Sequence, residues 1–304
     1  YTMQIIMSFL MITMISVMLP RAGVAADRIA EVIRTEGSIR DAQQVRDGER
    51  AEWSGKIEFS DVSFRYEGAD EDALSHLSFV AEPGKTTAII GSTGCGKSTL
   101  VNLIPRFYDV TDGTITIDGI DIRELSQKKL RSLLGVVPQK GVLFSGDIAS
   151  NLKFGGDGIT DEQMEEAAQI AQATEFIEEK PGGYHSEISQ GGTNVSGGQK
   201  QRLSIARAIA KHPKVLIFDD SFSALDYKTD AALRRALAEK TADATVIIVA
   251  QRINTILHAD QILVLEEGCI VGKGTHRELL ETCEAYQEIA NSQLSEEELK
   301  GGVC

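Results

Sequence analysis

The sequence predicts an α/β domain with a largely parallel core sheet, preceded by the end of a membrane-spanning helix. From about residue 56 onward, short apolar runs typical of strands alternate with stretches of helical periodicity. One of these runs leads into a glycine-rich segment with the spacing of a phosphate-binding loop. Residues 1–19, by contrast, carry no charged side chain and are almost wholly apolar.

The apolar run at residues 1–19 is interpreted as the inner end of a membrane span. Arg21 and Arg28 follow it, and basic residues beside a span favour its cytoplasmic end. Residues 22–35 place Ala, Val and Ile three and four apart among charged side chains, which predicts an amphipathic stalk. A secretory signal and a buried soluble helix are the alternatives, and the kind of domain that follows argues against the signal.

These features divide the chain into four parts. They are the end of the last transmembrane helix with its cytoplasmic stalk (1–35), a polar linker (36–55), the α/β domain (56–293) and an acidic flexible tail (294–304). The expected location is therefore the cell membrane, with the α/β domain on the cytoplasmic side.

The overall charge restricts the kind of partner. The 304 residues carry a formal net charge of -14, which argues against a protein that grips nucleic acid, because such a protein needs a basic face. We expect no nucleic-acid partner. A nucleotide can still bind, because backbone amides and a single lysine supply a local positive field.

Strands are predicted at six runs: Ile57–Tyr66, Thr86–Ile90, Thr114–Ile117, Val215–Phe218, Thr245–Val249 and Gln261–Leu265. Helices are predicted after Lys97, over Asp161–Glu179, after Gly198 and over Tyr227–Glu239. Because strands and helices alternate, the core sheet is expected to be mainly parallel.

The segment 91–99 reads GSTGCGKST and matches the phosphate-loop pattern, with an apolar strand before it and a helix after it. Lys97 would neutralise the β- and γ-phosphates of ATP, and the Ser98 hydroxyl would ligate Mg²⁺. A glycine-rich turn with a surface lysine is the alternative, which the flanking elements disfavour. The expected phosphate-binding residues are Gly91, Ser92, Thr93, Gly94, Cys95, Gly96, Lys97, Ser98 and Thr99.

An acidic pair follows the predicted strand at residues 215–218. Asp219 would lie at the carboxyl end of that strand, where parallel sheets present ligands, and could hold Mg²⁺ through water. An acidic pair after a strand is often only a turn. Together with the phosphate loop, however, it predicts a magnesium–nucleotide site.

The segment Asn194–Arg202, NVSGGQKQR, resembles the signature sequence of ABC ATPases, and its place between the phosphate loop and Asp219 follows the family's order. The resemblance covers about residues 57–293. It implies the ABC ATPase fold, in which the core sheet is joined by an antiparallel β subdomain and a helical subdomain. The upstream membrane helix and the ending GKGTHRELL resemble the exporter branch of the family.

The resemblance also implies roles for single residues. Tyr66 would stack on adenine, and Gln139 would sense Mg²⁺ and face the membrane domain. Ser223–Asp226 would form the loop that crosses a dimer. The signature residues would bind the nucleotide that a second subunit's phosphate loop holds; they are Ser196, Gly197, Gly198 and Gln199. Read from the residues alone, this segment opens a helix and so offers a second anion-binding helix start.

Two positions depart from the family's pattern. Asp220 stands where the family has its catalytic glutamate, and Gln251 stands where it has a histidine. The carboxylate is one methylene shorter, and misplacement by about 1 Å can cost ~10²-fold in rate. Glutamine also lacks the protonation behaviour and the reach of imidazole. We therefore expect the chain's own catalytic group, Asp220, Gln251 and Gln139, to form a degenerate ATP site.

This asymmetry is typical of one half of a heterodimeric, multidrug-type exporter. The signature is intact, so the chain would complete the active site of a partner subunit. A homodimeric exporter with slow hydrolysis, a soluble ABC ATPase and a regulatory module that never hydrolyses ATP are the alternatives. The expected cofactors are ATP and Mg²⁺, and the cargo could be a small molecule, a lipid or a peptide.

Overall fold

The computed structural model describes residues 1–156, 158–240 and 243–294, and the chain divides into two compact units at Arg40/Asp41. The first unit contains the helix α1, Thr2–Arg34. Among the described residues, it is the one helix long and apolar enough to cross a membrane. A single helix therefore covers both the expected span and the expected stalk.

The second unit is built on a six-stranded sheet with the order β12-β11-β3-β10-β9-β6. The five strands from β11 to β6 pair in parallel, and β12 pairs antiparallel at the edge. The α/β fold with a largely parallel core is therefore confirmed. The strands are β3 (Thr86–Gly91), β6 (Leu134–Val137), β9 (Val215–Asp219), β10 (Thr245–Val249), β11 (Gln261–Glu266) and β12 (Cys269–Gly274).

A second sheet is antiparallel and has the order β2-β1-β4-β5. Its strands are β1 (Ile57–Phe64), β2 (Leu74–Ala81), β4 (Asp112–Ile117) and β5 (Ile120–Asp121). Successive side chains of a strand point to opposite faces of the sheet, so alternate residues of the parallel strands join different buried clusters. Ile89, Ile217 and Ile247 share one buried cluster with Phe59 of this second sheet, whereas Ile90 and Phe218 belong to the other cluster.

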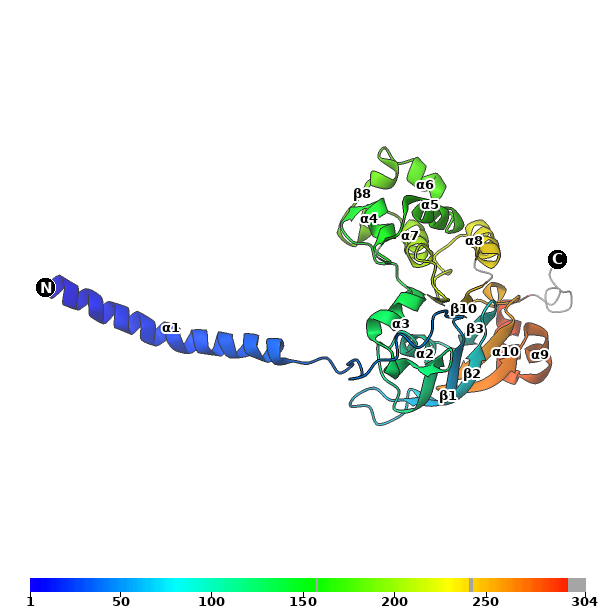
Figure 1. Ribbon diagram of the computed structural model, residues 1–304, viewed down its shortest axis with the longest axis horizontal. Coiled ribbons are helices and arrows are strands. Elements are labelled where there is room, and N and C mark those ends of the chain that lie inside the picture. Colours follow the sequence, from blue (N-terminus) through cyan, green and yellow to red (C-terminus); the bar gives the residue numbers. More distant parts are fainter. Residues whose placement is uncertain (157, 241–242, 295–304) are drawn as a thin grey trace. The chain divides into compact units, whose positions relative to one another are not determined.

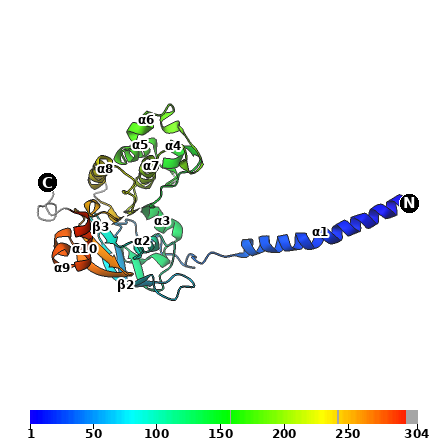
Figure 2. The same ribbon diagram turned by 180° about the vertical axis from the view of Figure 1, so that it is seen from behind.

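Some helices pack on the face of the parallel sheet that contains Ile90 and Phe218, and other helices form a separate group. Figures 1 and 2 both show α4 to α7 gathered apart from the sheet that contains β1 and β2. This group is the helical subdomain. The helices are α2 (Lys97–Leu103), α3 (Gln127–Leu133), α4 (Ile148–Lys153), α5 (Asp161–Ile170), α6 (Thr174–Glu178), α7 (Gly197–Ile209), α8 (Tyr227–Lys240), α9 (His276–Thr282) and α10 (Glu284–Gln293), with a short ladder of β7 (Gly146–Asp147) and β8 (Glu187–Ile188) beside α4.

The predicted helix over Asp161–Glu179 is corrected to two helices, α5 and α6. Gln172, between them, has a left-handed backbone with φ of 55°, which no α-helix can continue through. The predicted strand Ile57–Tyr66 also ends two residues early, at Phe64. Tyr66 is therefore a loop residue.

The expected linker 36–55 is divided by the structure, since residues from Asp41 onward belong to the α/β unit. Arg46 donates from its backbone N–H to the carbonyl oxygen of Glu124 and forms an ion pair with the Glu124 side chain at 2.7 Å. Asp47 accepts hydrogen bonds from the backbone and the hydroxyl of Ser126, the N-cap of α3. Of the expected tail 294–304, Leu294 is buried, and residues 295–304 lie outside the described residues.

One aspartate fastens the start of the α/β fold. Asp118, in the turn between β4 and β5, is buried and accepts backbone N–H bonds from Ser54, Gly55 and Lys56 at 2.8–3.0 Å. It also accepts from the Ser54 hydroxyl. Burial raises the pKa of Asp118, but these hydrogen bonds outweigh burial and hold the pKa below its ordinary value.

We expect Asp118→Asn to lower the free energy of unfolding by about 2 kcal/mol at pH 7, because a charged acceptor is replaced by a neutral amide. A lowered folded pKa stabilises the fold above the unfolded pKa of about 3.9, and that stability is lost as the pH falls through the folded value. The difference between parent and variant should therefore shrink below about pH 4. Urea unfolding across this range checks the prediction, with the exposed Asp70→Asn as control. A difference that does not change with pH would contradict it.

Candidate nucleotide-binding site

The phosphate loop runs from the end of β3 to the start of α2, and its backbone admits only glycine at two positions. A Cβ on Gly91 would clash with the carbonyl oxygen of Leu265. Gly96 has φ of 100°, and a Cβ there would lie 2.7 Å from a methyl carbon of Leu74. Glycine at these two positions lets the loop take a curled form, which suits the binding of an anion by successive backbone amides.

Lys97 is the cation of this loop. It is only 9% exposed, and its Nζ donates to the carbonyl oxygens of Gly91 and Ser92 at 2.8 and 2.6 Å. These bonds hold the ammonium group against the loop. The third N–H of the ammonium points to Cys95 Sγ at 3.6 Å, a weak acceptor that a phosphate oxygen would replace.

Ser98, in the first turn of α2, lies beside Asp219, the last residue of β9. Ser98 Oγ donates to Asp219 Oδ1 at 3.1 Å. Burial raises the pKa of Asp219, the neighbouring Asp220 raises it further, and Ser98 and Lys97 only partly offset them. A buried carboxylate beside a hydroxyl offers the hard oxygen ligands that Mg²⁺ prefers. A bound cation would also offset the free-energy cost of keeping the buried carboxylate ionised.

Asp220 lies between two glutamine side chains. Gln139 Nε2 donates to Asp220 Oδ2 at 3.1 Å, and Gln251 Nε2 donates to the same oxygen at 2.7 Å. Asp220 itself is buried and has a left-handed backbone, with φ of 46°. The three residues expected to form the degenerate catalytic group are thus in direct contact, with the carboxylate engaged by two amides.

The residues expected to bind a partner's nucleotide lie at the start of α7. Ser196 is its N-cap: Ser196 Oγ accepts from the Gln199 backbone, and the Gln199 side chain accepts from the Ser196 backbone at 3.0 Å. Figures 1 and 2 show α7 in the helical subdomain and α2 with the β core. In the described part of the chain, no hydrogen bond joins residues 196–199 to residues 91–99.

Tyr66 contacts the end of the phosphate loop through its hydroxyl group. Its hydroxyl lies 2.9 Å from the Thr99 Oγ1, and its ring makes nearly perpendicular contacts with Phe64 and Tyr108. About 38% of the residue remains exposed. A partly exposed aromatic ring therefore lies beside the loop.

A match between this sequence and a known protein family agrees with the geometry of the site. The sequence profile described as ABC transporter matches residues 74–223, which contain the phosphate loop, the signature and the acidic pair. The chain carries the ATP-binding domain of an ABC transporter. The ABC ATPase fold predicted for it is therefore confirmed.

Relatives and a solved structure agree with this assignment. The chain is 46% identical over 299 residues to an uncharacterized ABC transporter ATP-binding protein of Mycobacterium tuberculosis, covering 96% of this chain and 50% of that protein. It is 43% identical to an ATP-dependent lipid A-core flippase of Vibrio vulnificus over 80% of this chain and 42% of the flippase. A bacterial Atm1-family ABC exporter with ATP bound superposes with a TM-score of 0.84 at 35% identity, over 91% of this chain and 48% of the exporter. The chain spans about half the length of these relatives.

The ABC domain brings together most of the residues that the sequence singled out. The phosphate loop, Asp219, Asp220, Gln139 and Gln251 meet at the carboxyl ends of β3, β9, β6 and β10, as expected for an open parallel sheet. Tyr66 joins the phosphate loop through Thr99. The signature residues stand apart, at the start of α7.

Two further glutamines in the ABC domain escaped the sequence analysis. Gln201 on α7 is buried; its side chain donates to the Pro138 carbonyl and accepts from the Gly141 backbone, so it brackets the loop that carries Gln139. Gln293 on α10 brackets the loop of Gln251 in the same way, donating to the Gln251 carbonyl and accepting from Ile253. The place of Gln201 within the segment 194–202 was the one signal for it in the sequence, because its burial shows only in the structure.

Proposed function

We propose that the chain is the nucleotide-binding end of one subunit of an ABC exporter. It would lie on the cytoplasmic side of the cell membrane, with α1 as the end of the last transmembrane helix. ATP binding would close two such domains on each other, and ATP hydrolysis would release them, driving export. The observation that carries this proposal is that the phosphate loop opens α2 and Ser196–Gly198 open α7, on different subdomains. A second chain would have to supply the signature if both anion sites are to hold one nucleotide.

Within the chain's own site, Lys97 and the loop amides would bind the β- and γ-phosphates. Ser98 and Asp219 would hold Mg²⁺, and Gln139 would add its carbonyl Oε1, because its amide nitrogen is already anchored on Asp220. The magnesium ion supplies charge neutralisation at the phosphate oxygens. Tyr66 would stack on the adenine ring.

We further propose that this site is degenerate. A general base must reach the proton it accepts and must have a free lone pair aimed at it. The Asp220 carboxylate is one methylene shorter than glutamate and accepts two amide bonds on Oδ2. The shorter side chain opposes the positioning of an attacking water, and the two amide bonds leave Oδ1 as the oxygen that could accept its proton, so hydrolysis here should be slow.

The partner would then be a different exporter subunit with a competent site, which the signature of this chain completes. A homodimer with slow hydrolysis is the competing arrangement. The cargo belongs to the part of the transporter that this chain does not span, and a small molecule, a lipid or a peptide would each suit an exporter. The charge of -14 argues against nucleic acid as a partner.

We expect the purified chain, in lipid nanodiscs, to hydrolyse ATP very slowly. Asp220→Glu alone should restore little, because Gln251 still leaves the γ-phosphate without the histidine contact. Asp220→Glu combined with Gln251→His should raise the steady-state rate by ~10². The measurement is phosphate release for the parent, the two single variants and the double variant.

Adding Lys97→Ala to the double variant is the control, and it should abolish the gain. Fast hydrolysis by the parent chain, or full rescue by Asp220→Glu alone, would refute the degenerate site. Neither result would affect the assignment of the domain to the ABC transporters.

A further inference from the structure

Tyr66 lies in a loop, yet its ring is fixed on two sides. Its centroid is 4.8 Å from that of Phe64 and 5.4 Å from that of Tyr108, and both contacts are nearly perpendicular, at 80° and 84°. Phe64 and Tyr108 also contact each other at 5.4 Å, which closes a three-ring cluster. Phe64 is buried in β1, so the sheet fixes one neighbour. The other neighbour, Tyr108, is 41% exposed and comes from the loop between α2 and β4.

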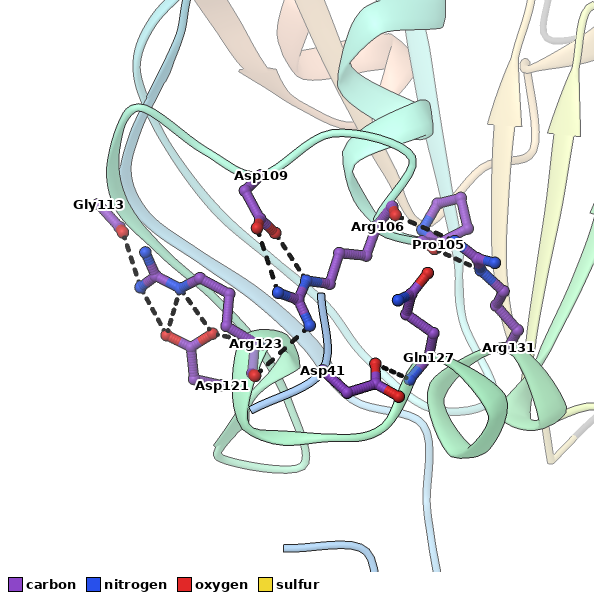
Figure 3. A network of polar contacts seen from close by, with 9 residues as sticks. All are labelled: Asp41, Pro105, Arg106, Asp109, Gly113, Asp121, Arg123, Gln127 and Arg131. Carbon is purple, nitrogen blue, oxygen red and sulfur yellow. Dashed lines mark hydrogen bonds and ion pairs between the residues drawn. The ribbon is translucent and has the colours of Figure 1, made fainter. Parts of the chain in front are cut away.

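An ion pair with a buried arginine stabilises the loop that carries Tyr108. Arg106 is only 5% exposed and binds Asp109 through two nitrogens, at 2.6 and 3.1 Å (Figure 3). It also donates to the carbonyl oxygen of Arg123. Because Arg106 has a left-handed backbone with φ of 55°, these contacts hold a turn that a non-glycine residue rarely adopts unaided.

Other contacts fasten both ends of the same loop. Arg131 of α3 donates to the carbonyl oxygens of Pro105 and Arg106, at 3.1 and 3.2 Å (Figure 3). At the far end, Thr111 donates its backbone N–H to Ser63 and accepts through its hydroxyl from the backbone of Arg65. The loop that carries Tyr108 is therefore fixed at both ends, and its far end is bonded to Arg65, the residue that precedes Tyr66.

We propose that Tyr108 is a positioning residue for nucleotide binding, which fixes the plane of Tyr66 for stacking on adenine. The inference rests on the proposed stacking role of Tyr66. A ring held by two perpendicular neighbours is ordered before the base arrives, so no conformational entropy of this ring is lost on binding. Edge-to-face aromatic pairs add stabilisation beyond the area they bury. The loop between α2 and β4 thus contributes to base binding without touching the nucleotide.

The test compares ATP with inorganic tripolyphosphate, which has the phosphates and no base. Tyr108→Ala in the full chain, purified in detergent, should weaken ATP binding about three- to tenfold, the effect of losing one aromatic pair. Tripolyphosphate should bind parent and variant equally. Tyr108→Phe keeps the ring and should keep the parent's affinity for ATP. Equilibrium dialysis with labelled ATP, and competition by tripolyphosphate, give both affinities.

Phe107→Ala is the matched control. Phe107 is adjacent and 47% exposed, and its ring contact is with the Arg131 guanidinium. Its loss should leave ATP affinity within about twofold of the parent.

Unchanged ATP affinity in Tyr108→Ala would overturn the inference, and so would an equal loss for tripolyphosphate. Tyr66→Ala distinguishes the two proposals. If Tyr66→Ala weakens ATP binding while Tyr108→Ala does not, the positioning role alone fails. If neither change matters, stacking by Tyr66 fails with it.

Discussion

Ser196→Arg or Gly197→Asp is expected to reduce ATP hydrolysis by the assembled transporter to near background. Ser196 caps α7, and the backbone amides that open this helix would stabilise charge on the phosphoryl group in the partner's site. Arginine removes the capping hydroxyl and fills the space, and an aspartate places a negative charge beside the phosphate. By contrast, Asp220→Asn should cost little, because that carboxylate would belong to the proposed slow site.

The measurement is steady-state ATPase activity of the lipid-reconstituted complex for all three variants, with assembly checked by size-exclusion chromatography. In a homodimer, Asp220 would be the carboxylate nearest the attacking water in both sites. Comparable losses from Asp220→Asn and from the signature variants would therefore exclude the asymmetric arrangement. The exporter proposal would stand in either case.

Lys97→Ala is expected to weaken ATP binding to this chain by about 10- to 100-fold. The variant removes charged hydrogen bonds to phosphate, each worth about 1.5–3 kcal/mol. It also removes the bonds to the Gly91 and Ser92 carbonyls, which hold the ammonium in the loop. Calorimetric titration with ATP and Mg²⁺ gives the affinity.

The exposed Lys128→Ala has the same change of charge away from the loop and should bind ATP as the parent does. A thermal unfolding curve for each variant separates lost binding from lost folding. Equal ATP affinities for Lys97→Ala and the parent would contradict the assignment of residues 91–99 as the phosphate loop.

Strong local patterns accounted for most of the parallel sheet. Strands β3, β9, β10 and β11 are runs of buried apolar residues, and they form close to where the sequence predicted them. The strand β12 was missed, because as an edge strand it buries little and its sequence, CIVGKG, has a weak apolar signal. Strand β2 was missed as well, since Ser75, His76 and Ser78 interrupt its apolar residues.

The candidate site also divides into features that local sequence predicts and contacts that only the folded chain shows. Spacing predicted the phosphate loop and Asp219. The resemblance to ABC ATPases predicted the signature and the unusual Asp220 and Gln251. That Gln139 and Gln251 both donate to one oxygen of Asp220 is a contact between three separate loops. The brackets formed by Gln201 and Gln293, and the ring cluster of Tyr108, are long-range contacts of the same kind.

By itself, then, the sequence determined the fold class, the apolar helix at the start and the chemistry of the phosphate loop, since each depends on periodicity or on neighbours within about ten residues. Only the tertiary structure decided where helices α5 and α6 part, that residues from Asp41 join the α/β unit, and which donors engage Asp220. Such contacts form between groups far apart in the chain. Their geometry follows from how the two sheets and the helices pack, because close packing brings these groups within hydrogen-bond range.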